Sequence, residues 1–119
     1  LTAAQQAIEY FETTGNRDIK NIAAYHLQQA AEKLIKLQIY RQLTNIDNRK
    51  MYTHDLQRLK DYGDSESVAL VIPEYICTHL NSITEWEAGS RYDVSFSIRI
   101  DVLKKTYISI SEWIKQIPR

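Results

Sequence analysis

Apolar residues recur at helical spacing from the start of the chain. Ala4, Ala7, Ile8 and Phe11 follow one another at helical spacing, as on one face of an amphipathic helix. Gly15 is a residue that commonly ends helices. The pattern therefore predicts a first helix over about residues 2–14.

A second and longer helix is predicted from Asp18 to about Leu43. Its apolar positions step by three or four: Ile19, Ala23, Leu27, Ala30, Leu34 and Leu37. Several of the inward positions are alanines, so the apolar stripe is thin and a neighbouring helix can approach closely.

The middle of the chain is less regular. Residues 44–53 are polar and predict a loop, after which Thr53 or His54 begins a short helix that ends at Gly63.

A further helical stretch is predicted from Ser65, with an interruption at Pro73. Since proline is tolerated in a first helical turn, the next helix is expected over about residues 73–88. Gly89 would be its C-terminal cap.

The last helix has the clearest pattern. Seven apolar residues are spaced alternately by four and three: Phe96, Ile100, Leu103, Tyr107, Ile110, Ile114 and Ile117. Ile98, Val102, Ile108 and Trp113 add a second apolar edge, wider than one intramolecular seam requires. We expect part of this surface, including Phe96, Tyr107 and Ile110, to form a homodimer contact. The predicted fold is all-α, an up-and-down antiparallel bundle of about five helices, with residues 1–119 as a single domain.

Composition supports this interpretation. The 119 residues are 44% hydrophobic and 25% charged, as in an ordinary globular protein. One cysteine excludes an internal disulfide framework and suits the cytoplasm. No run of 18 apolar residues occurs, so no membrane span is expected. Because the chain begins with Leu1 rather than methionine, we expect it to be trimmed or excised from a longer protein.

Charge is unevenly distributed although the net charge is zero. Residues 36–60 carry six lysines and arginines against two aspartates, whereas residues 61–93 carry seven acidic residues against one arginine. These blocks either form separate basic and acidic faces that steer a partner, or solvated faces that neutralise one another. The zero balance excludes a wholly basic nucleic-acid-binding protein.

Candidate chemistry is sparse. The three histidines and one cysteine show no metal-ligand spacing, so neither a metal nor a cofactor is expected. No glycine-rich loop is present to hold a phosphate. His54 and Asp55, in "YTHDLQRL" (52–59), lie at a helix start. There the imidazole could accept from free backbone N–H groups, while Asp55 complements the positive helix end. His54 either anchors the loop or binds a phosphate or base.

Three segments carry a resemblance when taken in order: "AAYHLQQAAEKLIKLQIY" (23–40), "THDLQRL" (53–59) and "SRYD" (90–93). Together they resemble the HEPN domains, across nearly the whole chain. The resemblance implies a helical bundle that commonly homodimerises. It also implies either a metal-independent RNase, often a toxin, or a nonenzymatic module associated with nucleotides or RNA. Many members are encoded beside, or fused to, a minimal nucleotidyltransferase.

The RNase members of that family carry an arginine, four to six intervening residues and a histidine. Arg91 matches the arginine, but Phe96 stands at the four-residue spacing and no histidine follows residue 79. Phenylalanine cannot exchange protons, so catalysis is not expected. Two roles stay open for Arg91. Either it binds a phosphate, with Tyr92 beside it, or it donates hydrogen bonds to the free carbonyl groups at the helix end after Gly89. Arg49 and His54 are also separated by four residues, but this pair straddles the predicted polar loop and the helix start after it, which is not where the family's pair lies.

Three functions remain open. The first is a noncatalytic HEPN module that homodimerises, binds a nucleotide or RNA through Arg91, Tyr92, His54 and Asp55, and serves a nucleotidyltransferase in a toxin–antitoxin-like system. The second is an RNase toxin with an atypical site, in which Arg91 and His54 are the candidate catalytic residues. The third is a structural domain whose basic and acidic blocks dock a protein.

Overall fold

The computed structural model describes residues 2–14, 17–92 and 98–117; within its helices, the side chains at positions 11, 13–14, 17–18 and 90–92 lie outside this description. The described residues contain seven α-helices and no strand. The helices are α1 (Thr2–Thr14), α2 (Arg17–Gln42), α3 (Asn48–Met51), α4 (Leu56–Ser65), α5 (Glu74–Thr78), α6 (Leu80–Tyr92) and α7 (Ile100–Gln116). The predicted all-α class is therefore confirmed, and five of these helices have at least ten residues.

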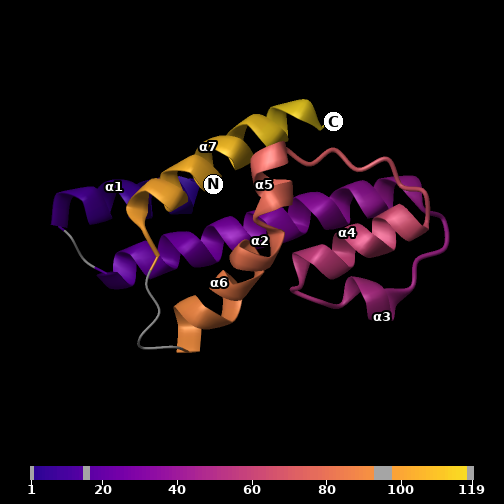
Figure 1. Cartoon of the computed structure of the whole chain (residues 1–119), viewed down its shortest axis with the longest axis horizontal. Coiled ribbons are helices and arrows are strands. Elements are labelled where there is room, and N and C mark those ends of the chain that lie inside the picture. Colours follow the sequence, from indigo (N-terminus) through magenta and orange to yellow (C-terminus); the bar gives the residue numbers. More distant parts are fainter. Residues whose placement is uncertain (1, 15–16, 93–97, 118–119) are drawn as a thin grey trace.

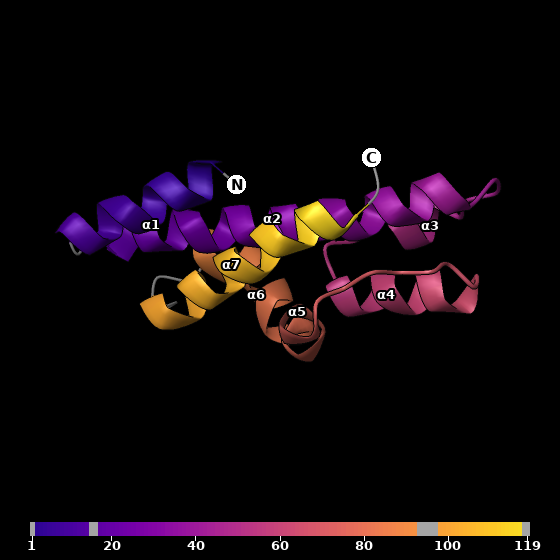
Figure 2. The same cartoon turned by 90° about the horizontal axis from the view of Figure 1, so that it is seen from above.

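The 26-residue helix α2 is the axis of the bundle. In Figure 1, α1 and α7 lie along one half of α2, and α3 and α4 lie along the other half. Helices α5 and α6 run obliquely across its middle. Figure 2, the view from above, shows the same division, with α1 and α3 at opposite ends of the molecule. Every helix contributes to one cluster of buried apolar side chains.

The buried face of α2 differs in part from the predicted stripe. Ala23 and Leu27 are fully buried as expected, but the face then continues through Ile35 and Ile39. Leu37, which the pattern placed inside, is 38% exposed. The reason is that residues separated from Leu27 by multiples of four lie on one face of α2, whereas Leu37 is outside that series. Helices α1, α6 and α7 pack against α2.

Helix α7 confirms most of the predicted seam. Leu103 and Ile110 are fully buried and Ile117 is 8% exposed, whereas Ile114 is 43% exposed. Trp113, predicted for the second apolar edge, is fully buried as well. The helix begins at Ile100, after an N-cap residue in extended conformation. The predicted start at Phe96 lies outside the described residues.

The single helix predicted over residues 73–88 is wrong. Helix α5 ends at Thr78, and His79 separates it from α6. The imidazole of His79 stacks on the ring of Tyr75, and its Nδ1 lies 2.7 Å from the Tyr75 carbonyl oxygen. These local contacts stabilise the break. Gly89 is not a cap, because α6 continues through it to Tyr92.

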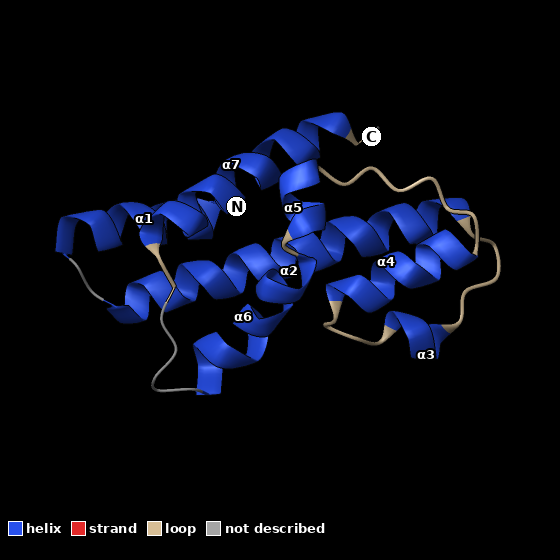
Figure 3. Ribbon diagram, viewed as in Figure 1, coloured by secondary structure: helices blue, strands red, loops and turns tan. Residues whose placement is uncertain are grey.

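The helical stretch predicted from Ser65 is also wrong, because residues 66–73 are not helical. Two glutamines of α2 hold this segment through its backbone. Gln38 accepts from the Val71 N–H at 2.7 Å and donates to the Val71 carbonyl at 3.1 Å. Gln42 makes the equivalent pair with Ala69, at 2.8 and 3.0 Å. Figure 3 shows this loop, in tan, running from α4 to α5. The amide side chains satisfy backbone groups that a strand would otherwise pair.

None of the described helices has the length and apolar character needed to cross a membrane.

Candidate functional site

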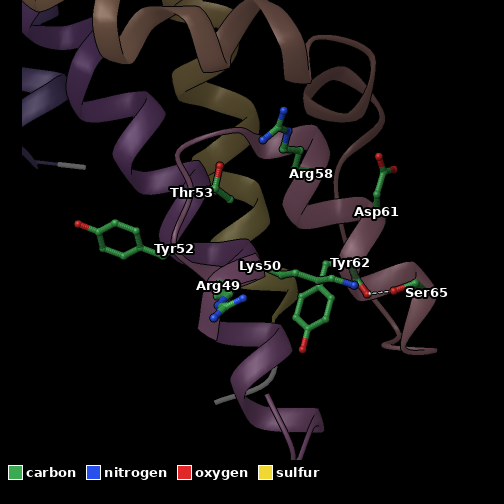
Figure 4. A pocket seen from close by; sticks show the side chains of 8 residues that line it. All are labelled: Arg49, Lys50, Tyr52, Thr53, Arg58, Asp61, Tyr62 and Ser65. Atoms are coloured by element: carbon green, nitrogen blue, oxygen red, sulfur yellow. Dashed lines mark hydrogen bonds between the residues drawn. The ribbon is translucent and has the colours of Figure 1, made fainter. Parts of the chain in front are cut away.

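Two neighbouring hollows border the loop between α3 and α4, one between α3 and α4 and the other against α2. The larger, called here the basic pocket, has a volume of about 480 Å³ and is shown in Figure 4. It is lined by Arg49, Lys50, Tyr52, Thr53, Arg58, Asp61, Tyr62 and Ser65. The smaller, called here the histidine pocket, has a volume of about 130 Å³ and is lined by Lys36, Tyr52, Thr53 and His54. Tyr52 and Thr53 belong to both.

The position of the short helix α3 follows from its cap and its anchor. Asp47 is the N-cap and accepts from the Arg49 N–H at 3.0 Å. The Asp47 N–H in turn donates to the hydroxyl of Tyr62 on α4, at 2.8 Å. Met51, the last residue of α3, is buried in the core and anchors the C-terminal end of the helix. This arrangement leaves Arg49 and Lys50 on the exposed side of the helix. The sequence predicted only a polar loop here.

The basic pocket carries three cations and one carboxylate. Arg49 and Lys50 come from α3, and Arg58 and Asp61 from α4. Arg58 is highly exposed and lies 3.6 Å from a carboxylate oxygen of Asp55. Exposed pairs at such distances are weak, so this arginine remains available to another anion.

Aromatic rings complete this pocket. The Lys50 ammonium lies 5.5 Å from the ring centroid of Tyr62, within the range of a cation–π contact. Tyr52 is 92% exposed, and its ring projects away from the ribbon in Figure 4. The pocket therefore combines positive charge with one exposed ring, that of Tyr52, because Tyr62 is only 5% exposed.

His54 lies at the centre of a hydrogen-bonded cluster that joins its loop to α2. Its Nδ1 lies 2.7 Å from Oε1 of Glu32, a residue only 5% exposed. Glu32 also accepts from Lys36 Nζ at 2.9 Å and from Gln28 Nε2 at 3.2 Å. Gln28 Nε2 donates as well to the backbone carbonyl of His54, at 3.1 Å. We call these four residues the Glu32 network.

The Glu32 network holds its carboxyl group ionised. Burial acts to raise the pKa of Glu32, but hydrogen bonds from Lys36, His54 and Gln28 outweigh it, and the pKa lies below its ordinary value. An ionised carboxylate only accepts, so Nδ1 of His54 must carry a hydrogen. The predicted bonding of this ring to backbone N–H groups is replaced by the bond to Glu32. The imidazole side chain is still 58% exposed.

Asp55 occupies the helix start where the sequence placed it. It is the N-cap of α4, and its Oδ1 accepts from the Arg58 N–H at 3.1 Å. Helix α4 therefore begins at Leu56 rather than at Thr53 or His54. The Leu56 N–H donates to the hydroxyl of Thr84 on α6, at 3.0 Å.

Arg91 and Tyr92 form the last residues of α6, and their side chains lie outside the described part of the structure. Phe96 lies outside it altogether. The backbone shows that Arg91 is still helical and does not follow a cap at Gly89. A role of Arg91 and Tyr92 in phosphate binding, and any approach of Arg91 to His54, stay predictions.

The sequence did not point to Glu32, and it did not indicate that several cations share one pocket. The signal for the cations was present, since Lys36, Arg49, Lys50 and Arg58 all belong to the basic block over residues 36–60. Among the described residues, no group of three histidine, cysteine or acidic side chains is arranged to hold a metal ion.

Comparison of the chain with protein-family models, with curated proteins and with solved structures found no match.

Proposed function

We propose that this chain is a noncatalytic HEPN-like module that binds a nucleotide or RNA through the basic pocket. The observation that carries the proposal is the composition of that pocket. Arg49, Lys50 and Arg58 face a hollow of about 480 Å³ with Asp61 as the one carboxylate in its lining. Phosphate is the ligand group that such a set of cations suits.

The size of the pocket and the exposed ring of Tyr52 support the same ligand class. Its volume falls within the range of about 300–1,000 Å³ typical of small-molecule sites. Tyr52 supplies a ring that is open to a ligand, and stacking on an aromatic ring contributes about 1–3 kcal/mol per base. The resemblance to HEPN domains, stated from the sequence, supports the same ligand class independently of the pocket.

The noncatalytic part rests on Phe96, which stands where RNase members of the resembled family carry histidine.

One observation favours the RNase alternative. The imidazole of His54 is held by a carboxylate beside a basic pocket, an arrangement able to support proton transfer. Incubation of RNA with the protein in the presence of a chelator distinguishes the two. Cleavage that His54→Ala removes would establish the RNase.

The binding test uses a labelled single-stranded RNA and fluorescence anisotropy. Replacing both Arg49 and Lys50 by alanine is expected to weaken binding at least about 10-fold and to reduce its salt dependence. The matched control replaces Lys105 and Lys115, two exposed lysines of α7, by alanine. Equal losses in the two double variants, or no loss in the first, would refute binding through the basic pocket.

We propose further that the chain forms a homodimer through α7. Ile108 and Ile114 are 55% and 43% exposed on this helix, which supports an apolar contact. Ile110, which the sequence suggested for the contact, is fully buried and cannot contribute without rearrangement. Light scattering is expected to give twice the monomer mass of 13.9 kDa at high micromolar concentration. A monomer mass would reject the dimer.

A cytoplasmic nucleotidyltransferase partner, in a toxin–antitoxin-like system, is supported by the resemblance alone. Co-expression and co-purification of the two chains would test it, and loss of the complex at high salt would implicate the charged blocks.

A further inference from the structure

We propose that the basic pocket and the histidine pocket form one continuous binding track for single-stranded RNA. In this track Tyr52 stacks a base between two phosphate subsites, and His54 contacts the ribose. The inference rests on the proposed function and names its ligand.

Continuity follows from the shared lining. Tyr52 and Thr53 border both hollows, so a chain that leaves one pocket enters the other across these two residues. Each side has its own cations: Arg49, Lys50 and Arg58 on one side, and Lys36 on the other. Lys36 uses one of its three donors on Glu32, which leaves two for a phosphate. A mononucleotide has phosphates at one position, whereas a polynucleotide places one at each step.

Tyr52 has the features of a stacking platform. At 92% exposure its ring contributes little to the core, so its packing does not explain an aromatic residue at this place. Side chains anchor the chain on both sides of Tyr52. Met51, directly before it, is buried, and the imidazole of His54, two residues after it, is bonded to Glu32. A ring on an anchored loop loses little conformational freedom when a base stacks on it.

His54 gives the track a means to distinguish RNA from DNA. Because Nδ1 donates to the ionised Glu32, the neutral imidazole has its lone pair on Nε2. Nε2 is then a hydrogen-bond acceptor, which suits a ribose 2′-hydroxyl and does not suit a phosphate oxygen. The 2′-hydroxyl is the group by which proteins distinguish RNA from DNA. Without the Glu32 contact, the ring could exchange tautomers and offer a donor instead.

The experiment measures anisotropy of a labelled RNA octamer and of the DNA octamer of the same sequence, at pH 8 with the full chain. The unmodified protein is expected to bind RNA several-fold more tightly than DNA. Tyr52→Ala is expected to weaken binding of both about 10-fold, and Tyr52→Phe to restore most of that loss. Tyr10→Ala is the matched control. It removes an exposed tyrosine of α1, at the opposite end of the molecule from α3 (Figure 1).

His54→Ala is expected to weaken RNA binding more than DNA binding and so to remove the preference for RNA. Equal affinity of the unmodified protein for RNA and DNA would overturn the role of His54. Unchanged binding by Tyr52→Ala, or a mononucleotide that competes as well as the octamer, would overturn the track and leave the basic pocket standing. Absence of binding to any of these ligands would refute the proposed function itself.

Discussion

Replacing Glu32 by alanine tests the central feature of the site. The substitution removes a buried carboxylate that accepts from His54, Lys36 and Gln28, at 2.7, 2.9 and 3.2 Å. It therefore releases one of the two contacts between the loop before α4 and α2 that involve His54, and leaves the bond from Gln28 to the His54 carbonyl.

The size of the stability loss depends on how well each former partner of Glu32 can be rehydrated. Hydrogen bonds to a charged group contribute about 1.5–3 kcal/mol each, but removal of the buried charge also removes its desolvation cost. The side chains of His54 and Lys36 are 58% and 23% exposed and can be rehydrated. Gln28 is fully buried but keeps its bond to the His54 carbonyl. We expect the free energy of unfolding to fall by about 2 kcal/mol, a large part of the 5–15 kcal/mol typical of a domain.

Urea unfolding at pH 7, followed by circular dichroism, measures this loss. With a slope of about 1–3 kcal/mol per molar urea, the midpoint should fall by about 1 M. The matched control is Glu112→Ala, which removes an exposed glutamate from α7 and should change stability by less than about 0.5 kcal/mol. Combining Glu32→Ala with His54→Ala should reveal a coupling of about 1 kcal/mol. If Glu32→Ala and Glu112→Ala unfold at the same urea concentration, the network does not stabilise the fold.

Two further predictions concern pH and the loop. Since the pKa of Glu32 is lowered by folding, its contribution to stability is present above about pH 4.5 and is lost as the pH falls through the lower value of the folded state. Urea midpoints between pH 7 and 3 should therefore show the stability difference between the unmodified protein and Glu32→Gln shrinking in acid; a constant difference would contradict the lowered pKa. Gln38→Ala should speed hydrogen exchange of the Val71 amide at least about 10-fold, because that N–H loses its acceptor. The exposed Gln116→Ala is the control, and unchanged exchange at Val71 would show that Gln38 does not hold the loop.

Helix type and approximate bounds were accessible from the sequence because hydrophobic periodicity is a local property. The first helix was predicted over residues 2–14 and observed there, and α2 begins and ends within one residue of its prediction. The errors have identifiable causes. At the break, His79 stacks on Tyr75, and no proline or glycine marks that position in the sequence. Residues 66–73 are not helical, and Gln38 and Gln42, on a distant helix, bond the backbone of Val71 and Ala69.

The residues of the candidate site also divide into those that the sequence identified and those that only the packing of the helices brought together. Asp55 was identifiable as a helix-start residue, since capping involves neighbours in sequence. The charge block over residues 36–60 contained the cations, but its linear pattern does not indicate which of them share a pocket. Glu32 and His54 are 22 residues apart, and their contact exists because α4 packs against α2.

The sequence by itself thus determined the all-α class, the long helices and the residues able to carry charge, because these depend on residue type and short-range spacing. The tertiary structure alone decided that Glu32 fixes the donor nitrogen of His54. It also decided that Tyr52 borders both the basic pocket and the histidine pocket. Both arrangements require α2 to pack against the region of α4 and the loop before it.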